Sequence, residues 1–208
     1  MFAREREFDS QVWAAAQSMT VPLAHRATFP ALIKAVMAAE SAFNPAAYRA
    51  EPQIADASRG LMQVLERTAR SLGYTAPVGN DSTRTGGLYD PMTSTYLGAK
   101  LLAQNLTIAR GSDPDIAISA YNAGWSPSRA GDAKRTSTGA FVNQPYVDRV
   151  KGYWRYFQGQ PLVVQQGTGA VPPQPTASPQ ESGTVAVVTW VGLALVALLY
   201  WLRRAIVP

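Results

Sequence analysis

The chain has 208 residues, with 19 Lys and Arg against 14 Asp and Glu, so 16% of it is charged and the formal net charge is +5. This length allows one ordinary domain with appendages. The chain has no cysteine and one histidine, His25, which excludes a disulfide scaffold, a thiolate nucleophile and Cys- or His-rich metal sites, so we expect no metal or cofactor. The basic residues are scattered rather than clustered in runs, which predicts no specific nucleic-acid binding.

Residues 1–160 form the predicted domain, and their pattern is typical of a mainly α-helical fold. Helices are predicted from Asp9 or Ser10 to Met19, from Pro30 to about Ser41, from Glu66 to Leu72, from Pro91 to about Leu106, from Pro114 to Gly124 and between Gln144 and Phe157. The connections at 75–87 and 125–140 are too polar for a core, and no alternating pattern of useful length predicts a strand.

A linker and an apolar segment of different composition follow this domain. Residues 161–183 hold five prolines and one charged residue, Glu181, with few large apolar side chains, which predicts a solvated tether. Residues 184–202 are 19 residues without a charge. As a helix they would be about 28 Å long, close to the ~30 Å hydrocarbon layer of a bilayer, so this segment is a predicted transmembrane span.

The ends of this span predict how it is oriented. Tyr200 and Trp201 stand at its C-terminal end, and Arg203 and Arg204 begin a short basic tail that reaches residue 208. The positive-inside tendency places this tail in the cytoplasm and the 1–160 domain on the non-cytoplasmic side. At the other end of the chain, the first ten residues lack the apolar run of an ordinary signal peptide.

Glu40 is the candidate catalytic residue of the domain. It lies one residue before the end of a predicted helix, close to Met37 and Phe43. The negative end of the helix dipole and these apolar neighbours would both raise the pKa of its carboxyl group. A glutamic acid with a raised pKa is a proton donor near neutral pH.

Short motifs accompany Glu40 in a fixed order along the chain. They are AAESAFNPAA at 38–47, GLMQ at 60–63, Asp90-Pro91 followed by Gly98, ISAYNAG at 118–124 and Pro145-Tyr146-Val147. In order and spacing they resemble the lytic transglycosylases that share the goose-type lysozyme fold, over about residues 30–157. Glu66 and Ser94 depart from this pattern, because the family commonly has proline and asparagine there. The resemblance implies a lysozyme-like helical domain that acts on peptidoglycan.

The resemblance also implies a role for each matched residue. Glu40 would be the catalytic acid and base, and Tyr146 would hydrogen-bond near its carboxylate. The implied substrate-binding residues are Ser41, Met62, Gln63, Tyr121, Asn122 and Tyr146. These residue types suit a glycan, because amides and hydroxyls bind its hydroxyl and N-acetyl groups and aromatic faces pack on sugar rings.

The implied reaction uses one carboxyl group of the enzyme. Glu40 would protonate the glycosidic oxygen between N-acetylmuramic acid and N-acetylglucosamine. The ionised Glu40 would then deprotonate the muramic acid 6-hydroxyl, which closes a 1,6-anhydro ring without water. The implied partners are therefore peptidoglycan glycan strands.

Two alternatives from other functional classes remain open. Asp56 or Glu51 could serve as a second carboxylate that activates water, which would make the protein a hydrolysing muramidase. Loop carboxylates, however, are most often solvated surface groups. The protein could also be a non-catalytic glycan-binding membrane protein on the same fold, although a pure binder has no need of a proton-donating Glu40.

The combination of a wall-degrading domain with a C-terminal span predicts where the protein acts. Together with the poor signal peptide, it is more typical of a bacteriophage virion component than of a housekeeping cell-wall enzyme. We expect the protein in a virion membrane or delivered to the host envelope, where it opens the wall locally during phage entry. Expected partners are a lipid bilayer, through residues 184–202, and other virion membrane proteins. A tail-anchored cellular enzyme or an accessory muramidase of a secretion apparatus is the alternative.

Overall fold

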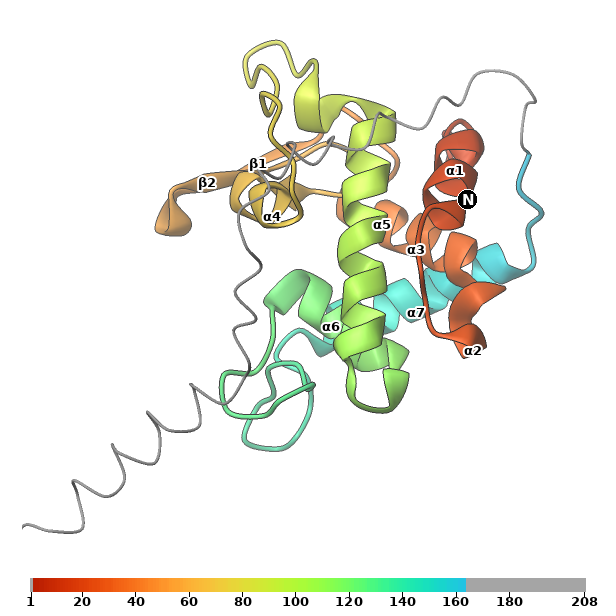
Figure 1. Ribbon diagram of the computed structural model, residues 1–208, viewed down its shortest axis with the longest axis vertical. Coiled ribbons are helices and arrows are strands. Elements are labelled where there is room, and N and C mark those ends of the chain that lie inside the picture. The colour runs from red at the N-terminus through yellow and green to blue at the C-terminus, as the bar shows by residue number, and fades with distance from the viewer. Residues whose placement is uncertain (1, 164–208) are drawn as a thin grey trace, which may run out of the picture. The chain divides into compact units, whose positions relative to one another are not determined.

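The computed structural model describes residues 2–163, whose arrangement is shown in Figure 1. The α-helices in chain order are α1 (Asp9–Gln17), α2 (Leu23–Arg26), α3 (Phe29–Ser41), α4 (Glu66–Ser71), α5 (Pro91–Ile108), α6 (Pro114–Ala123) and α7 (Gln144–Gln158). Short 3-10 helices lie at Pro52–Ile54, Gly87–Tyr89 and Arg110–Ser112. The predicted mainly helical class is confirmed, and of these α-helices the four-residue α2 is the one that the sequence pattern did not indicate.

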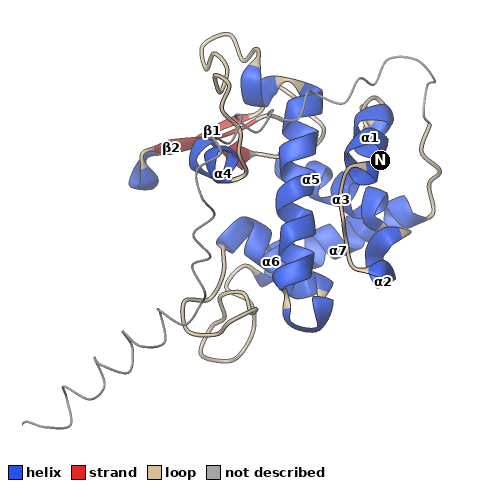
Figure 2. Cartoon of the chain, in the orientation of Figure 1, coloured by secondary structure: helices blue, strands red, loops and turns tan. Residues whose placement is uncertain are grey.

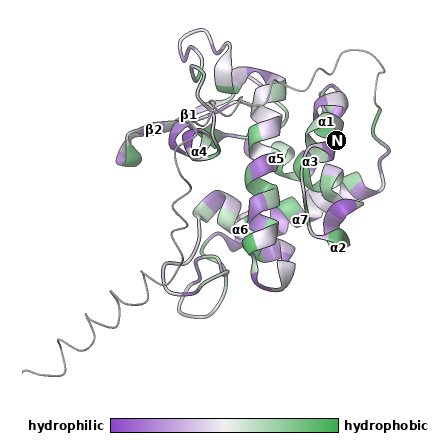
Figure 3. Ribbon diagram, in the orientation of Figure 1, coloured by the Kyte–Doolittle hydropathy of each residue, from purple (hydrophilic) through white to green (hydrophobic). Residues whose placement is uncertain are grey.

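The helices α3 and α5 carry much of the core. α5 packs against α1, α3 and α6, and α3 packs against α7. The apolar positions of α3 are completely buried, namely Leu32, Ile33, Val36 and Met37. Helices that pack against a core carry apolar residues on one face and polar residues on the other. In Figure 3 hydrophobic and hydrophilic residues accordingly alternate along the helices. The buried face of α3 fixes the position of its C-terminal end, where Glu40 lies.

Side-chain caps explain where two of the helices begin. The carboxylate of Asp90 accepts a hydrogen bond from the backbone N–H of Thr93 at 2.8 Å, and Pro91 occupies the first turn of α5. Asp113 accepts in the same way from the N–H of Asp115 at 2.8 Å, at the start of α6. These are the Asp-Pro signals that predicted both helix starts.

The chain leaves α3 through a tight turn. Ala42 and Phe43 both have a positive φ, of 50° and 64°, and the Phe43 side chain is fully buried. This conformation is costly for residues other than glycine, so the buried phenylalanine ring must hold it in place. The turn directs the chain from Glu40 into the segment that follows.

A small antiparallel sheet, which the sequence did not predict, follows this turn. Its strands are β1 (Tyr48–Glu51), β2 (Asp56–Arg59) and β3 (Val64–Leu65), in the order β1-β2-β3. Figure 2 shows β1 and β2 as a ribbon beside α4. The prediction that the domain has no strands is therefore wrong. The strand sequences are YRAE, DASR and VL, which are too short to show an alternating apolar pattern. Their strand structure comes from pairing between neighbouring segments rather than from the propensity of their residues.

The predicted linker 161–183 and span 184–202 lie almost entirely outside the described residues. Within residues 2–163, no helix is both long enough and apolar enough to cross a bilayer.

Candidate active site

Glu40 lies in the last turn of α3, where a tyrosine of α7 holds its carboxyl group. The hydroxyl of Tyr146 donates a hydrogen bond to Glu40 Oε1 at 2.6 Å. Tyr146 is only 6% exposed, because α7 packs along α3. The two residues are 106 positions apart, so the packing of the two helices brings them together.

The protonation of Glu40 is shifted by its surroundings. Burial raises the pKa of Glu40 to about 7, although the hydrogen bond from Tyr146 and the charges of Arg49 and Arg149 lower it. The raised pKa expected from the sequence is thus found, with burial as its main cause. A carboxyl group with this pKa exists in both forms near neutral pH and can both give and take a proton.

A cavity of about 250 Å³ opens beside Glu40. Its lining comes from the end of α3, from the sheet and the connections between its strands, and from the helices α4, α5 and α6. The residues that line it are Glu40, Arg49, Glu51, Gln53, Ile54, Ser58, Gln63, Val64, Leu65, Thr68, Leu101, Tyr121 and Asn122. Polar and charged side chains surround Glu40, whose carboxyl group has a raised pKa, and this combination is typical of an active site.

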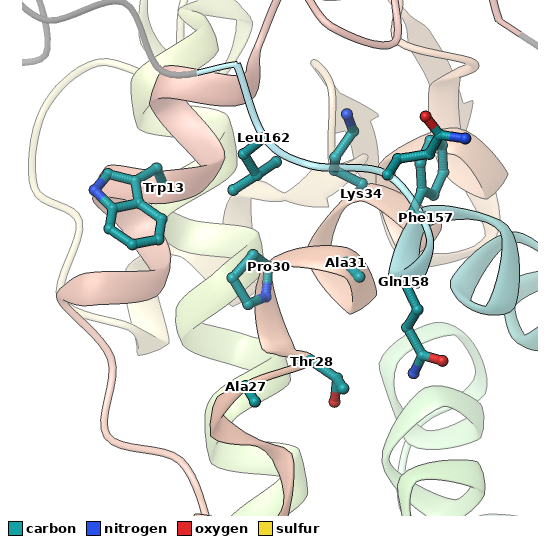
Figure 4. A pocket seen from close by; sticks show the side chains of 10 residues that line it. Trp13, Ala27, Thr28, Pro30, Ala31, Lys34, Phe157, Gln158 and Leu162 are labelled. Carbon is teal, nitrogen blue, oxygen red and sulfur yellow. The ribbon is translucent and has the colours of Figure 1, made fainter.

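A larger cavity, of about 730 Å³, lies between α1, α3 and the end of the described chain. Figure 4 shows the side chains that line it, among them Trp13, Pro30, Lys34 and Leu162. None of the predicted site residues lines it. We therefore place the candidate active site in the smaller cavity, where the titratable groups gather.

Gln63 lines the Glu40 cavity from the turn at 60–63. Its amide Nε2 donates to the carbonyl oxygens of Ala47, at 3.1 Å, and Gly60, at 3.0 Å. Gly60 is required in this turn, because its φ is +72° and an added Cβ would lie 1.9 Å from the Leu88 carbonyl oxygen. The amide nitrogen of Gln63 is thus fixed by the backbone, which leaves Oε1 as a hydrogen-bond acceptor for a ligand.

Tyr121 lines the cavity from α6, and its hydroxyl group is bound by the backbone of Met62. The Tyr121 hydroxyl donates to the Met62 carbonyl oxygen at 2.8 Å. Burial and the charge of Glu40 hold the pKa of Tyr121 well above its usual range, so it stays a neutral donor. The Met62 side chain is 0% exposed and packs against Gly98, and its N–H donates to Ser94 Oγ at 3.1 Å. The expectation that the Met62 side chain contacts the substrate is therefore wrong, because this side chain lies in the core.

Asn122 and Ser41, the remaining predicted residues, lie at the edge of the site. Asn122 lines the cavity, and its Oδ1 accepts a hydrogen bond from Asn143 Nδ2 at 3.0 Å. Ser41 does not line the cavity: its Oγ lies 2.8 Å from the Leu61 carbonyl oxygen and 3.2 Å from that of Met37. Ser41 thus ties the end of α3 to the turn at 60–63.

The two carboxylates considered as a second catalytic group have different surroundings. Asp56 accepts hydrogen bonds from the backbone N–H groups of Glu66 and Arg67 at 3.1 Å each, at the start of α4. Burial alone would raise the pKa of Asp56, but these bonds outweigh it and the pKa lies below its usual range. Asp56 does not line the cavity, whereas Glu51 does. Hydrogen bonds from Gln53 and the Arg49 side chain lower the pKa of Glu51 despite some burial.

Two cavity residues, Arg49 and Ser58, were missed by the sequence reasoning. They face each other across the β1–β2 pair, and Ser58 is 4% exposed. The signal that could have found them is the two-residue spacing of Arg49 and Glu51, because alternate residues of a strand share a face. This spacing indicates a shared face only if a strand is predicted at these residues, and the sequence predicted none.

Comparison with known proteins identifies the family of this domain. A family model described as Transglycosylase SLT domain matches residues 22–141. The match includes Glu40, Gln63, Tyr121 and Asn122 and ends before Tyr146. No solved structure matches the chain.

Proposed function

Because the chain belongs to the Transglycosylase SLT domain family, and so is a peptidoglycan lytic transglycosylase, we propose that Glu40 alone serves as its catalytic acid and base. The bond cleaved is the β-1,4 linkage from N-acetylmuramic acid to N-acetylglucosamine. The observation that carries the proposal is the setting of Glu40, which faces a polar cavity, accepts a hydrogen bond from Tyr146 and has a pKa near 7.

The reaction proceeds in two proton transfers through the same carboxyl group. Protonated Glu40 gives its proton to the glycosidic oxygen as the bond to the muramic anomeric carbon breaks, and the N-acetyl carbonyl of the substrate stabilises the developing positive charge. The ionised Glu40 then takes the proton of the muramic 6-hydroxyl, whose oxygen attacks the anomeric carbon. A 1,6-anhydro sugar leaves, and Glu40 is protonated again without the entry of water.

The surroundings of the other carboxylates support this one-carboxylate reaction. Asp56 is occupied by the first N–H groups of α4 and does not line the cavity. Glu51 lines the cavity, but Arg49 Nε at 2.6 Å and Gln53 Nε2 at 2.8 Å each donate to one of its oxygens. A base that activates water must have an oxygen free to accept a proton, and these partners compete for it.

Replacing Glu40 tests its assignment. We expect Glu40→Gln to reduce the release of fragments from purified peptidoglycan sacculi about a thousandfold, because the amide can neither donate nor accept the required proton. Glu66→Gln is the matched control, since Glu66 is an exposed carboxylate of α4 outside the cavity. Unchanged release by a folded Glu40→Gln protein would refute the assignment.

We also propose that the enzyme is anchored in a membrane through residues 184–202 and opens the wall as part of a bacteriophage virion during entry. The support is the run of 19 uncharged residues followed by Arg203 and Arg204, joined to a wall-degrading domain. Peptidoglycan lies outside the cytoplasmic membrane, so an anchored domain would act on the wall next to that membrane.

Detecting the protein in purified virions tests this location. We expect the protein in the virion membrane fraction and its release by detergent but not by high salt. Its presence in membranes of uninfected cells, with none in virions, would contradict the virion placement and favour a tail-anchored cellular enzyme.

A further inference from the structure

One face of the small sheet forms a wall of the Glu40 cavity. Arg49 and Glu51 are two residues apart on β1, and Ser58 is the cross-strand partner of Arg49 on β2. Side chains in these positions share a face of the sheet, and all three line the cavity. Arg49 is the one basic side chain among the described residues that line it.

The hydrogen bonds of Arg49 leave much of its guanidinium group unused. Its Nε donates to Glu51 Oε1 at 2.6 Å, and within residues 2–163 its two terminal nitrogens have no hydrogen-bond acceptor. Its side chain is 64% exposed, whereas that of Glu51 is 15% exposed. Glu51 therefore acts as a fixed support for Arg49, and Gln53 and Ser58 hold Glu51 in turn.

Arg59, on the next strand, provides a comparison, because its guanidinium group is paired with a carboxylate through two nitrogens. Its Nε and one terminal nitrogen donate to the two oxygens of Asp81, at 2.7 and 2.8 Å, and its side chain is 8% exposed. This is the bidentate pair that arginine forms with carboxylates. Arg49 has the same donors but lacks such a partner, and it lies where the substrate would bind.

The charges of the cavity indicate which kind of group on the substrate Arg49 would bind. The acidic residues that line it are Glu40 and Glu51, and Glu51 is bound to Arg49. A substrate carboxylate that enters would be repelled by these groups unless a cation compensates it. The muramic acid residue at the cleavage site carries such carboxylates on its 3-O substituent, either on the peptide stem or, where the stem is absent, on the lactyl group to which the stem is otherwise joined as an amide.

We propose that Arg49, held by Glu51, binds a carboxylate on the 3-O substituent of the muramic acid, so that the enzyme prefers strands bearing this charge. This inference rests on the proposed function, because it takes the Glu40 cavity as the place of cleavage. Arg49 is then a residue that determines specificity; its charge lowers the pKa of Glu40, but its side chain itself gives and takes no proton.

The test compares substrates in which the carboxylates are intact, converted to amides, or removed with the stem. The full-length protein and its variants are given purified sacculi, sacculi whose carboxylates have been converted to amides with carbodiimide, and strands freed of stem peptides by an amidase. Arg49→Gln removes the guanidinium group. Arg129→Gln is the matched control for net charge, because Arg129 is exposed and lines none of the cavities described above.

We expect the wild type and Arg129→Gln to lose about fivefold in kcat/KM when the carboxylates are blocked, the size expected for an exposed ion pair. Arg49→Gln should cleave untreated and blocked sacculi equally. If Arg49 served folding alone, Arg49→Gln would change kcat/KM for untreated and for blocked sacculi by the same factor. The ratio of the two values would then stay at that of the wild type, and this result would overturn the inference. The amidase hydrolyses the amide between the lactyl group and the stem, so it removes the stem carboxylates and frees a lactyl carboxylate. On these strands, retained dependence on Arg49 shows that a carboxylate at the lactyl position is sufficient, and lost dependence places the bound carboxylate on the stem.

The same experiment separates the two proposals. If the wild type releases no anhydro sugars from untreated sacculi, the proposed function fails. If it releases them and Arg49→Gln keeps the wild-type ratio between substrates, only the inference about Arg49 fails.

Discussion

The hydrogen bond from Tyr146 is the strongest interaction by which α7 lowers the pKa of Glu40. Burial raises the pKa of Glu40 to about 7, and the Tyr146 hydroxyl opposes this by stabilising the carboxylate. The site therefore balances two demands, since Glu40 must be protonated before cleavage and ionised after it.

Removing this hydroxyl should shift the pH dependence of the enzyme. Tyr146→Phe raises the pKa of Glu40 above its present value of about 7, because a group that favours the ionised form is lost. The protonated acid then persists to higher pH, so the alkaline limb of kcat/KM moves upward. Its maximum should fall about tenfold, because the carboxyl group loses its orienting partner. The measurement is the pH dependence of fragment release from sacculi.

Tyr153→Phe is the control for this experiment. Tyr153 belongs to the same helix, and its hydroxyl makes no hydrogen bond within residues 2–163. Its profile should match that of the wild type. An alkaline limb of Tyr146→Phe that stays in place, or moves to lower pH, would contradict this account of Glu40.

At the scale of the elements, α4 begins where the sheet supplies its cap. The carboxylate of Asp56, on β2, accepts from the N–H groups of Glu66 and Arg67 at the start of α4. These N–H groups have no partner inside the helix, and a negative charge at this end is favoured by the helix dipole. The cap fixes the short helix against the sheet, next to the wall of the cavity.

Replacing Asp56 separates a structural role from a catalytic one. Asp56→Ala should lower the free energy of unfolding by about 2 kcal/mol, at the upper end for a lost helix cap. The kcat should stay within about twofold of the wild type at temperatures where the variant is folded, because Asp56 lies outside the cavity. Urea unfolding and fragment release measure the two effects. A stable but inactive Asp56→Ala protein would instead support a second catalytic carboxylate.

The helices could be predicted from the sequence because their signals are local. The buried stripe of α3 and the Asp-Pro starts of α5 and α6 are all visible within a few turns of chain. The sheet could not be predicted, because Arg49, Glu51 and Ser58 are polar residues on a face that lines a cavity rather than a core. Their arrangement depends on pairing between β1 and β2, which no pattern of hydrophobic residues reports.

The site was predictable to the extent that motifs reflect it. Glu40, Gln63, Tyr121 and Asn122 meet in one cavity, as the motif order suggested. Met62 and Ser41 serve the site indirectly, Met62 through its backbone carbonyl and Ser41 through its bond to the turn at 60–63. A motif records that a residue type is needed but not whether its side chain or its backbone is used.

At the scale of the whole domain, a buried ion pair joins α1, α3 and the end of the described chain. Lys34 Nζ donates to Asp9 Oδ1 at 2.6 Å, and these side chains are 3% and 0% exposed. The backbone N–H of Val163 donates to the other Asp9 oxygen at 2.8 Å. Phe157, whose ring centroid lies 5.0 Å from Lys34 Nζ, covers the pair.

Breaking this pair should destabilise the domain strongly. Asp9→Ala leaves the Lys34 ammonium group buried without a carboxylate, so we expect a loss of about 3–5 kcal/mol in the free energy of unfolding. The exposed pair of Arg4 and Glu7 gives the contrast, and Glu7→Ala should cost less than about 1 kcal/mol. Urea unfolding of both variants measures the difference. Equal losses would show that the buried pair does not hold the helices together.

The central claim, that Glu40 alone drives cleavage without water, is tested most directly by product analysis in water enriched in heavy oxygen. The wild-type protein digests purified sacculi in this water, and mass spectrometry identifies the new glycan ends. We predict 1,6-anhydro-muramic acid ends without solvent oxygen, and none of these ends from Glu40→Gln. Reducing ends that carry solvent oxygen would contradict the claim and identify a hydrolase that uses a second carboxylate.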